Sequence, residues 1–328
     1  MILGIIILLL LLGFGTLYIN RKAKSTNGYN NLCIDIKTFR DGLPEKIQLV
    51  NTGSTYSKFA FSSLSDKHLN YADFSLQSES LEMDDAIFNH YVDRLEPGCV
   101  VVVVVAAACL LLYRETGENL LYYQILDDKE IPTYSVKTKI KALFPVLKNK
   151  RLLKKVLKDD LKWNSIYDSQ KVNLSDQEST VYLDGLESAW ETLFHLSDLK
   201  SSNLSQENYD NINLNIHYLN SIIEKCKEKS LRPVIVVPPF SRKLNDRFSK
   251  EFTDKVVDSY LSKVSQEQEV PYLNYQYDEY FQDKENLYID KGFRLNYLGS
   301  TVFVNRLFSD LKMYGIDISN KTVGEHDA

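Results

Sequence analysis

The sequence predicts an α/β fold of three layers, in which a mainly parallel sheet lies between two layers of helices, preceded by an N-terminal transmembrane helix. Three observations support this prediction. Short apolar runs alternate along the chain with longer segments in which apolar residues recur every three or four positions. A block of consecutive valines at 100–105 favours a buried strand at the centre of the sheet. Residues 2–19 carry no charged side chain.

The uncharged stretch at 2–19 is 18 residues long, which is about the minimum for a helix that crosses a roughly 30 Å hydrocarbon layer. Arg21, Lys22 and Lys24 follow it. A cleavable signal peptide would have a basic start, a shorter apolar region and a small-residue cleavage site, and this stretch has an uncharged start and no such site. We therefore predict an uncleaved membrane anchor over 1–20 and a juxtamembrane linker over 21–45. The basic cluster after the anchor favours a cytoplasmic domain, and charge alone leaves the orientation open.

The overall composition is that of a soluble globular domain. The chain has 328 residues, of which 44% are hydrophobic and 25% charged, and this excludes a disordered or fibrous protein. Its formal net charge is -5, which argues against a surface that binds nucleic acid. Its four cysteines have neither C-x-x-C spacing nor a histidine cluster beside them. We therefore expect buried thiols, no metal and no cofactor.

Five segments are predicted as strands, namely 46–51, 72–76, 99–112, 232–237 and 270–274. Three helices lie between and after them, at 80–95, 209–229 and 296–312. The first of these ends at Glu96-Pro97-Gly98, a helix stop that a strand follows at once. The other two each carry one apolar stripe that would face a sheet. The segment 99–112 is too short for a second membrane span, so we predict that it is the central strand.

Residues 114–206 interrupt this alternation with a polar stretch and are predicted to be an insertion. The domain would then consist of a first part at 46–113 and a second part at 207–314, with a polar tail at 315–328. Within the insertion, 137–162 is rich in lysine and in apolar residues, and Pro145 divides it. Part of this segment could be a basic amphipathic helix on an anionic membrane, or an ordinary solvated helix that covers the domain.

Chemistry is expected just after the strands, because ligands of open α/β sheets bind at the carboxyl ends of the strands. After the first strand, Gly53, Ser54 and Thr55 form a turn with hydroxyl groups. Such a turn could stabilise an oxyanion, and Ser and Thr are also common N-caps, so the residues leave both interpretations open. Gln77 and Ser78 follow the second strand.

Before the last helix stands the segment 290–296, with Asp290 at its start and Asn296 as a natural N-cap. The glycine turn, this D-x-x-x-x-L-N segment and the closing helix together resemble the SGNH/GDSL-type hydrolases, whose fold is a flavodoxin-like α/β/α sandwich. The resemblance covers about 45–112 and 207–312 and leaves the insertion unmatched. A single anchor before one domain is similar to the membrane-anchored D-alanyl transfer proteins and other proteins that modify cell-envelope polymers.

The resemblance implies a bacterial protein in the cell membrane, with its domain outside the cytoplasm, that hydrolyses or transfers acyl esters through a Ser-His-Asp arrangement. Its partners would be the membrane, a cell-envelope polymer or acyl donor, and a membrane-bound O-acyltransferase. Carried over to this chain, the catalytic residues are Ser54, Thr55 and Asp290. The oxyanion or substrate-binding residues are Gly53, Gln77, Ser78, Arg294 and Asn296.

The chain departs from the family pattern at three places. Thr55 stands at the nucleophile position, with Ser54 one place early. No asparagine follows the central strand, and Arg294 occupies the place of the histidine. Arginine stays protonated and cannot act as a general base. Five histidines are present, at 68, 90, 195, 217 and 326, and each is expected to be a surface or packing residue, so Glu79 and Asp290 are the possible substitute bases.

Three functions follow from these residues. The first is an SGNH-like acyl-ester hydrolase or O-acyltransferase with Ser54 or Thr55 as nucleophile. The second is a non-catalytic accessory protein of the same fold, in which Arg294 holds an anionic or acyl group. The third is an α/β domain whose site lies in the insertion.

Overall fold

The structure is a computed structural model that describes residues 2–24, 34–66, 70–113, 120–144, 174–201 and 203–318. Its contacts divide the chain into two compact units. The first unit consists of Met1–Gly42 and Gly117–Ser169, and the second of Leu43–Thr116 and Gln170–Ala328. The interval 114–206, which the sequence presents as one insertion, therefore contributes to both units.

The second unit is built on a five-stranded sheet in the order β2-β1-β3-β4-β5. All four strand pairs are parallel, as predicted. The strands are β1 (Ile47–Thr52), β2 (Tyr71–Asp73), β3 (Leu95–Val104), β4 (Arg232–Val237) and β5 (Tyr272–Asn274). This strand order is that of flavodoxin-like sheets, and it reverses between β1 and β3.

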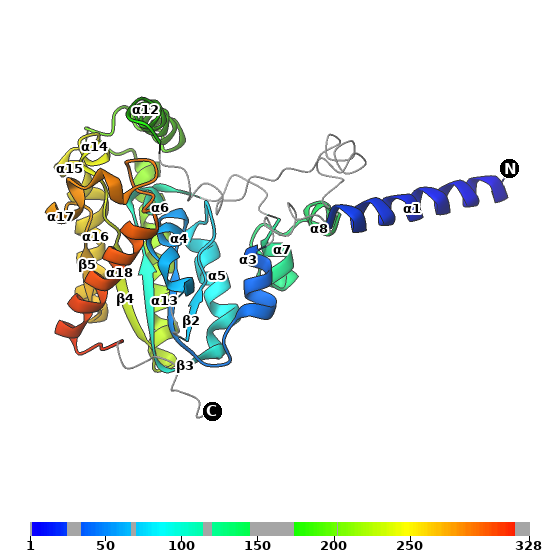
Figure 1. Cartoon of the computed structure of the whole chain (residues 1–328), viewed down its shortest axis with the longest axis horizontal. Helices are drawn as coiled ribbons and strands as arrows, with labels where there is room; N and C mark the ends of the chain where they lie inside the picture. Colours follow the sequence, from blue (N-terminus) through cyan, green and yellow to red (C-terminus); the bar gives the residue numbers. More distant parts are fainter. Residues whose placement is uncertain are drawn as a thin grey trace. The chain divides into compact units, whose positions relative to one another are not determined.

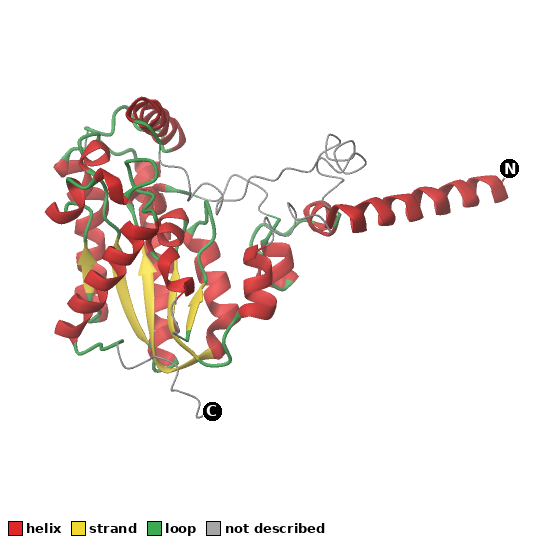
Figure 2. Ribbon diagram, in the orientation of Figure 1, coloured by secondary structure: helices red, strands yellow, loops and turns green. Residues whose placement is uncertain are grey.

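Helices cover both faces of this sheet (Figures 1 and 2), so the three predicted layers are confirmed. On one face, α13 (Gln206–Glu228) packs against α5 (Leu81–Tyr91) and α16 (Ser259–Gln268). On the other face, α18 (Tyr297–Leu311) packs against α4 (Thr55–Ala60). Shorter helices connect them: α6 (Ala107–Leu111), α14 (Arg242–Asn245), α15 (Lys250–Thr253) and α17 (Glu279–Gln282), with a π-helical turn at Asp254–Asp258 and 3-10 turns at Ser62–Asp66, Val92–Arg94, Glu285–Leu287 and Lys312–Tyr314.

The predicted central strand at 99–112 is right in its place and wrong in its length. β3 ends at Val104, and the following Ala-Ala-Cys-Leu-Leu segment forms α6. The reason is that alanine and leucine favour a helix while the β-branched valines favour a strand. β3 also begins earlier, at Leu95, so the predicted helix stop at 96–98 lies inside the strand. The side chains of Val100 to Val105 are fully buried and form the centre of the core.

Several other boundaries differ from the prediction, among them the starts of β5 at Tyr272 and of α13 at Gln206. β2 ends at Asp73 rather than at residue 76, and α5 ends at Tyr91 before a 3-10 turn at Val92–Arg94. In both places apolar residues stay buried beyond the end of the regular element, namely Phe74 and Leu76 after β2 and Val92 after α5, so the apolar pattern extends past the element. The predicted helices at 209–229 and 296–312 are confirmed as α13 and α18.

The helix α12 (Asp176–Leu193) belongs to the second unit, although it comes from the predicted insertion. Ser175 caps its start, since the Ser175 hydroxyl accepts the N–H of Glu178 while the Glu178 carboxylate accepts the N–H of Ser175. This reciprocal pair is a capping box, which fixes where the helix begins.

The first unit contains α1 (Ile2–Lys24), α3 (Ile34–Lys37), α7 (Tyr122–Ile125) and α8 (Val136–Leu143), with a π-helical turn at Thr38–Gly42 and a 3-10 turn at Asp128–Glu130. The predicted anchor falls within α1, but the side chains of residues 2–11 lie outside the described set. Among the residues whose side chains are described, no helix is both long enough and apolar enough to cross a membrane. Of the predicted amphipathic segment 137–162, only the part up to Phe144 is described, and Pro145 lies outside it.

The close approach of α18 to the chain before it gives a stability prediction. A Cβ atom on Gly299 would lie 2.1 Å from the carbonyl oxygen of Leu287, whereas a Cβ atom on Gly185 in α12 would meet nothing within 4 Å. We expect Gly299→Ala to lower the free energy of unfolding by about 2 kcal/mol or more, because backbone must move. Gly185→Ala should raise it by about 0.5–1 kcal/mol through helix propensity.

Urea unfolding of the two variants, followed by circular dichroism, measures both changes. If the two substitutions had the same effect, the close packing of α18 against Leu287 would be wrong.

Candidate functional site

The turn after β1 lies at the place where the strand order reverses, beside the carboxyl end of β3. Gly53 adopts a positive φ of 128°, which L side chains rarely adopt. A Cβ atom on this residue would also lie 2.7 Å from the carbonyl oxygen of Val104. Only glycine therefore fits where the turn crosses the end of β3.

The Asp84 carboxylate, at the start of α5, holds this turn in place. Its Oδ1 atom accepts a hydrogen bond from the backbone N–H of Gly53 and another from the hydroxyl of Thr52, each at 2.8 Å. Asp84 is only 2% exposed. A buried carboxylate oxygen with two donors fixes the position of the turn.

A second buried carboxyl group joins Asp84 from the turn after β2. The Glu79 side chain forms a hydrogen bond with Asp84, and its Oε2 atom accepts the backbone N–H of Leu76 at 2.8 Å. Two carboxyl groups can share a hydrogen bond only if one of them keeps its proton. Burial raises the pKa of Asp84 to about 6, against the opposing effect of its hydrogen bonds to Thr52, Glu79 and Gly53. The pair thus ties the turn after β1 to the turn after β2.

Thr55 is the residue of the turn that is accessible. It is half-buried, whereas the other residues from Asn51 to Ala60 are buried. Ser78, with a positive φ of 58°, donates its backbone N–H to the Thr55 Oγ1 atom at 3.1 Å. Gln77 and Ser78 are both exposed. The structure therefore brings the predicted residues Thr55 and Ser78 together at one accessible point.

The Ser54 hydroxyl is buried and does not serve as a helix cap. Ser54 occupies the N-cap position of α4, but its side chain makes no capping hydrogen bond. Its Oγ atom lies 3.6 Å from the Sγ atom of Cys109 in α6, and Ser54 is 5% exposed. Burial raises the pKa of the Cys109 thiol to about 11, so this thiol is protonated near neutral pH.

The other predicted pair, Asp290 and Arg294, forms a buried ion pair. The Arg294 Nε atom donates to Asp290 Oδ2 at 2.9 Å, and the backbone N–H groups of Gly292 and Arg294 donate to Oδ1 at 2.9 and 3.1 Å. Asp290 is completely buried, and the Arg294 side chain is 20% exposed. Both carboxylate oxygens of Asp290 therefore accept hydrogen bonds. The donor to Oδ2 is Arg294, the residue that stands where the SGNH-type pattern has a histidine.

Aromatic rings lie against the Arg294 guanidinium. The carbon at its centre lies 4.6 Å from the ring centroid of Tyr182 in α12 and 5.8 Å from that of Phe59 in α4. The ring of Tyr56, next to Thr55, packs against Phe293 at 4.6 Å between centroids. Burial raises the pKa of Tyr182 to about 12, so its phenol keeps its proton. Through Tyr56 and Phe59, α4 therefore connects Thr55 with the Arg294 segment.

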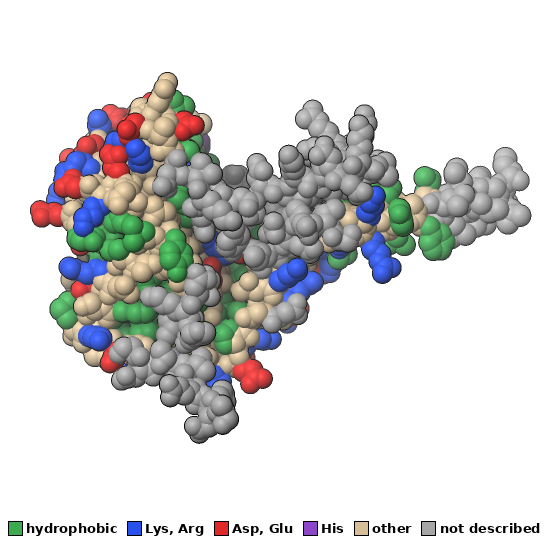
Figure 3. All heavy atoms as spheres, viewed as in Figure 1, with side chains coloured by type: hydrophobic (Ala, Val, Ile, Leu, Met, Phe, Trp, Pro, Cys, Tyr) green, Lys and Arg blue, Asp and Glu red, His purple; other side chains and the backbone are tan. Residues whose placement is uncertain are grey.

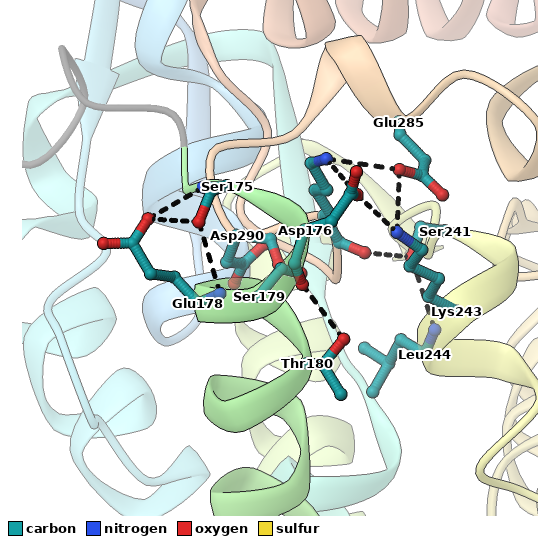
Figure 4. A network of polar contacts seen from close by, with 11 residues as sticks. Ser175, Asp176, Glu178, Ser179, Thr180, Ser241, Lys243, Leu244, Glu285 and Asp290 are labelled. Carbon is teal, nitrogen blue, oxygen red and sulfur yellow. Dashed lines mark hydrogen bonds and ion pairs between the residues drawn. The ribbon is translucent and has the colours of Figure 1, made fainter.

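Helix α12 is attached to this segment by polar contacts (Figure 4). The Ser179 hydroxyl donates to the carbonyl oxygen of Asp290 at 2.7 Å. The Asp176 carboxylate pairs with Lys291, the next residue along, and with Lys243 at 3.0 Å. These contacts, together with Tyr182, make α12 a wall of the candidate site.

Among the described residues, the Thr55 hydroxyl forms no hydrogen bond with a carboxylate or a histidine ring, and the ring of His90 contacts Tyr91. Asp290 is engaged by Arg294, and Glu79 is 2% exposed and engaged by Asp84 and Leu76. His195 pairs with Glu207 at 3.1 Å, and the ring of His217 contacts Tyr218. His68 and His326 lie outside the described residues.

Asn296 has a structural role in this fold. Its Oδ1 atom accepts the N–H of Gly299 at 2.9 Å as the N-cap of α18, and its Nδ2 atom donates to the carbonyl oxygen of Asn286 at 2.7 Å. Both ends of the amide are therefore used to hold the start of α18.

Four residues of the site were not predicted from the sequence, namely Tyr56, Asp84, Cys109 and Tyr182. The one visible signal was Asp84, an acidic residue among apolar ones on a helix that faces the sheet. Among the described residues, no three His, Cys, Asp or Glu side chains are grouped as metal ligands. A cavity of about 960 Å³ lies at the amino ends of β4 and β5, lined by residues such as Lys227, Arg232, Tyr272 and Ile316, and it contains none of the candidate residues.

Comparison with known proteins gives little further information. No protein-family model and no curated protein sequence matches the chain. Among solved structures, the chain is similar to a candidate acylhydrolase from Bacteroides fragilis, with a TM-score of 0.43 and 9% identity over 89% of this chain and 100% of that one. At that score and identity the likeness establishes neither a family nor a reaction.

The Asp84 pair gives a pH prediction. The pKa of Asp84 is raised in the folded protein, to about 6 from about 3.9 in an unfolded chain. The stability that the protonated group contributes is therefore fully present below about pH 4 and is lost as the pH rises through 6. We expect it to fall by on the order of 2–3 kcal/mol over this range.

Asp84→Asn keeps the Oδ1 acceptor for Gly53 and cannot ionise, so the stability of this variant should not fall over the same range. Urea unfolding at several pH values compares it with the wild type. Asp93→Asn, at an exposed carboxylate that pairs with Lys229, is the control. Identical pH profiles for wild type and Asp84→Asn would contradict the raised pKa of Asp84.

Proposed function

We propose that this chain is a membrane-anchored, SGNH-like accessory protein that binds an anionic or acyl group of a cell-envelope polymer without hydrolysing it. The observation that carries the proposal is the ion pair between Arg294 and Asp290. In a Ser-His-Asp arrangement, the aspartate would orient a neutral histidine that accepts the nucleophile's proton. Here the aspartate is saturated by a permanent cation.

The missing base has a large effect on rate. General-base assistance contributes about 10²- to 10⁴-fold, and a threonine hydroxyl without it is a poor nucleophile near neutral pH. Glu79 and Asp290, which could have replaced the histidine, are buried and engaged. The geometry therefore favours binding over turnover.

The ligand class follows from the exposed part of Arg294. One edge of the guanidinium is used by Asp290, and 20% of the side chain is open to solvent. A guanidinium presents several N–H donors in a plane, which suits a carboxylate or phosphate oxygen. The Tyr182 phenol and the apolar rings beside it suit an acyl or sugar group attached to that anion.

The place of action is proposed from the sequence. The uncharged stretch at 2–19 would anchor the chain in the cell membrane as a single span. The domain would lie outside the cytoplasm beside a membrane-bound O-acyltransferase, as the family resemblance implies. An accessory protein there would hold the polymer while the acyltransferase acts on it.

One observation favours the second candidate, an acyl-ester hydrolase or O-acyltransferase with Thr55 as nucleophile. The Ser78 N–H donates to the Thr55 hydroxyl oxygen at 3.1 Å, so this hydroxyl is held in a fixed position at an accessible point after β1, where a nucleophile could attack an ester. The binding proposal predicts that this arrangement is inactive.

Covalent labelling separates the two candidates. We expect the full-length chain in detergent to form no adduct with a serine-hydrolase phosphonate probe, because no base activates Thr55 or Ser54. Intact-mass analysis of wild type, Thr55→Ala and Ser54→Ala is the measurement. An adduct on wild type that Thr55→Ala abolishes would contradict the proposal and establish the enzyme.

Ligand binding tests the role of Arg294. We expect glycerol phosphate, as a probe for a polymer phosphodiester, to bind the wild type and to bind Arg294→Gln about 10- to 100-fold more weakly, since a charged hydrogen bond contributes about 1.5–3 kcal/mol. Isothermal titration calorimetry measures this change. Arg306→Gln is the matched control, because Arg306 pairs with Asp310 through the same Nε contact four residues apart on α18.

Arg294→Gln leaves the buried Asp290 without its cation, so a double variant with Asp290→Asn keeps the site neutral. The double variant should fold and still bind weakly. Equal affinities in wild type and in both Arg294 variants would contradict an anion site at this residue.

A further inference from the structure

Helix α8 in the first unit presents an exposed apolar stripe. Val136, Ile140 and Leu143 are 63%, 47% and 45% exposed, and they stand four and three residues apart, on one side of the helix. The opposite side buries Thr138 and Ala142 against the unit. The stripe is thus an outward face that the described residues leave uncovered.

Lysines lie on both sides of this stripe. At about 100° per residue, Lys137 and Lys139 fall on opposite flanks of the line through Val136 and Ile140. Lys139 pairs with Asp128 of the neighbouring 3-10 turn, whereas Lys137 is exposed. No acidic residue occurs within α8. An apolar stripe between lysines is the pattern of a helix that lies in a membrane interface, with the lysines reaching toward headgroups.

The end of α8 is joined to α1. The Asn20 Nδ2 atom donates to the carbonyl oxygen of Leu143 at 3.1 Å, and Asn20 is buried. In Figure 1, α1 runs across the view while α8 is seen nearly end-on beside its C-terminal end, so the two axes cross. If α1 crosses a bilayer, α8 therefore runs along the surface of that bilayer.

The exposure of the α1 side chains changes at Asn20. Before Asn20 the described side chains Leu12, Phe14, Leu17 and Tyr18 are 54–68% exposed. From Asn20 onward the helix packs into its unit, with Ala23 buried, and carries the basic residues Arg21, Lys22 and Lys24. Figure 3 shows hydrophobic side chains and Lys or Arg side chains close to one another along the described part of α1. The boundary between apolar and basic side chains marks where a membrane surface would lie.

We propose that α8 docks on the surface of an anionic lipid bilayer, with Val136, Ile140 and Leu143 inserted at the headgroup level beside the membrane span of α1. This inference rests on the membrane anchor of the proposed function. Continuity with α1 through Asn20 places the stripe at the right level. The basic residues of α1 and α8 outnumber the acidic groups Asp127, Asp128 and Glu130 of the 3-10 turn that faces α8, which suits an anionic surface.

An environment-sensitive fluorophore at position 140 tests the proposal. The full-length chain carrying Cys33→Ser and Ile140→Cys is labelled with NBD and reconstituted in vesicles that contain phosphatidylglycerol. Three native cysteines, Cys99, Cys109 and Cys226, are buried and should not be labelled. The matched control is Met313→Cys, at a 77% exposed residue of the second unit.

We expect lipids with a spin label near the headgroup to quench the probe at 140 at least about twofold more than the probe at 313. Aqueous iodide should quench the two probes in the reverse order. A probe at 140 that is as accessible to iodide as the one at 313 would overturn the proposal. Protection from iodide without quenching by lipid would also overturn it, in favour of a protein that covers the stripe.

Vesicle flotation of the same samples distinguishes this inference from its premise. If the chain floats while position 140 stays in water, the docking of α8 is contradicted and the membrane anchor is not. If the chain does not float, both the docking and the anchor are contradicted. Neither result bears on ligand binding at Arg294, which is measured in detergent.

Discussion

The candidate site depends on the completely buried carboxylate of Asp290. A charge in such a place is stable only with a cation and hydrogen-bond donors around it, and Arg294, with the backbone N–H groups of Gly292 and Arg294, supplies them. The chain must therefore turn back on itself between residues 290 and 294. Ser179 binds the Asp290 carbonyl, so the same requirement holds α12 and its Tyr182 against the site.

Two buried carboxyl groups, those of Asp290 and Asp84, hold the two sides of the site in place. Asp290 is neutralised by a cation, whereas Asp84 shares a hydrogen bond with another carboxyl group and has its pKa raised by burial. The ion pair holds the Arg294 segment in place, and the raised pKa of Asp84 makes the Gly53 turn sensitive to pH. Thr55 lies between them on α4, with a backbone donor from Ser78 and no base.

The sheet could be predicted from the sequence because strand positions depend on local apolar runs, and the valines at 100–105 form its buried centre. The end of β3 could not be predicted, because the residues at the end of β3 and those of α6 are all apolar. The difference in helix propensity between valine and the alanine and leucine that follow determines where β3 ends. The contact between Thr55 and Ser78 could be predicted, because both residues follow neighbouring parallel strands. The contact between Asp290 and Arg294 could be predicted because both residues lie in one short segment. Tyr182 and Cys109 were not, because their positions depend on how α12 and α6 pack in three dimensions.

Arg294 is held by Asp290, and 20% of its side chain is still open to an anion. The most direct measurement is the ¹⁵Nε resonance of Arg294 in the full-length chain, assigned by its loss in Arg294→Lys. We expect an Nε proton that is protected from exchange with water and a resonance that shifts as glycerol phosphate is added. A rapidly exchanging Nε proton, or a resonance that the anion leaves unchanged at saturation, would contradict it.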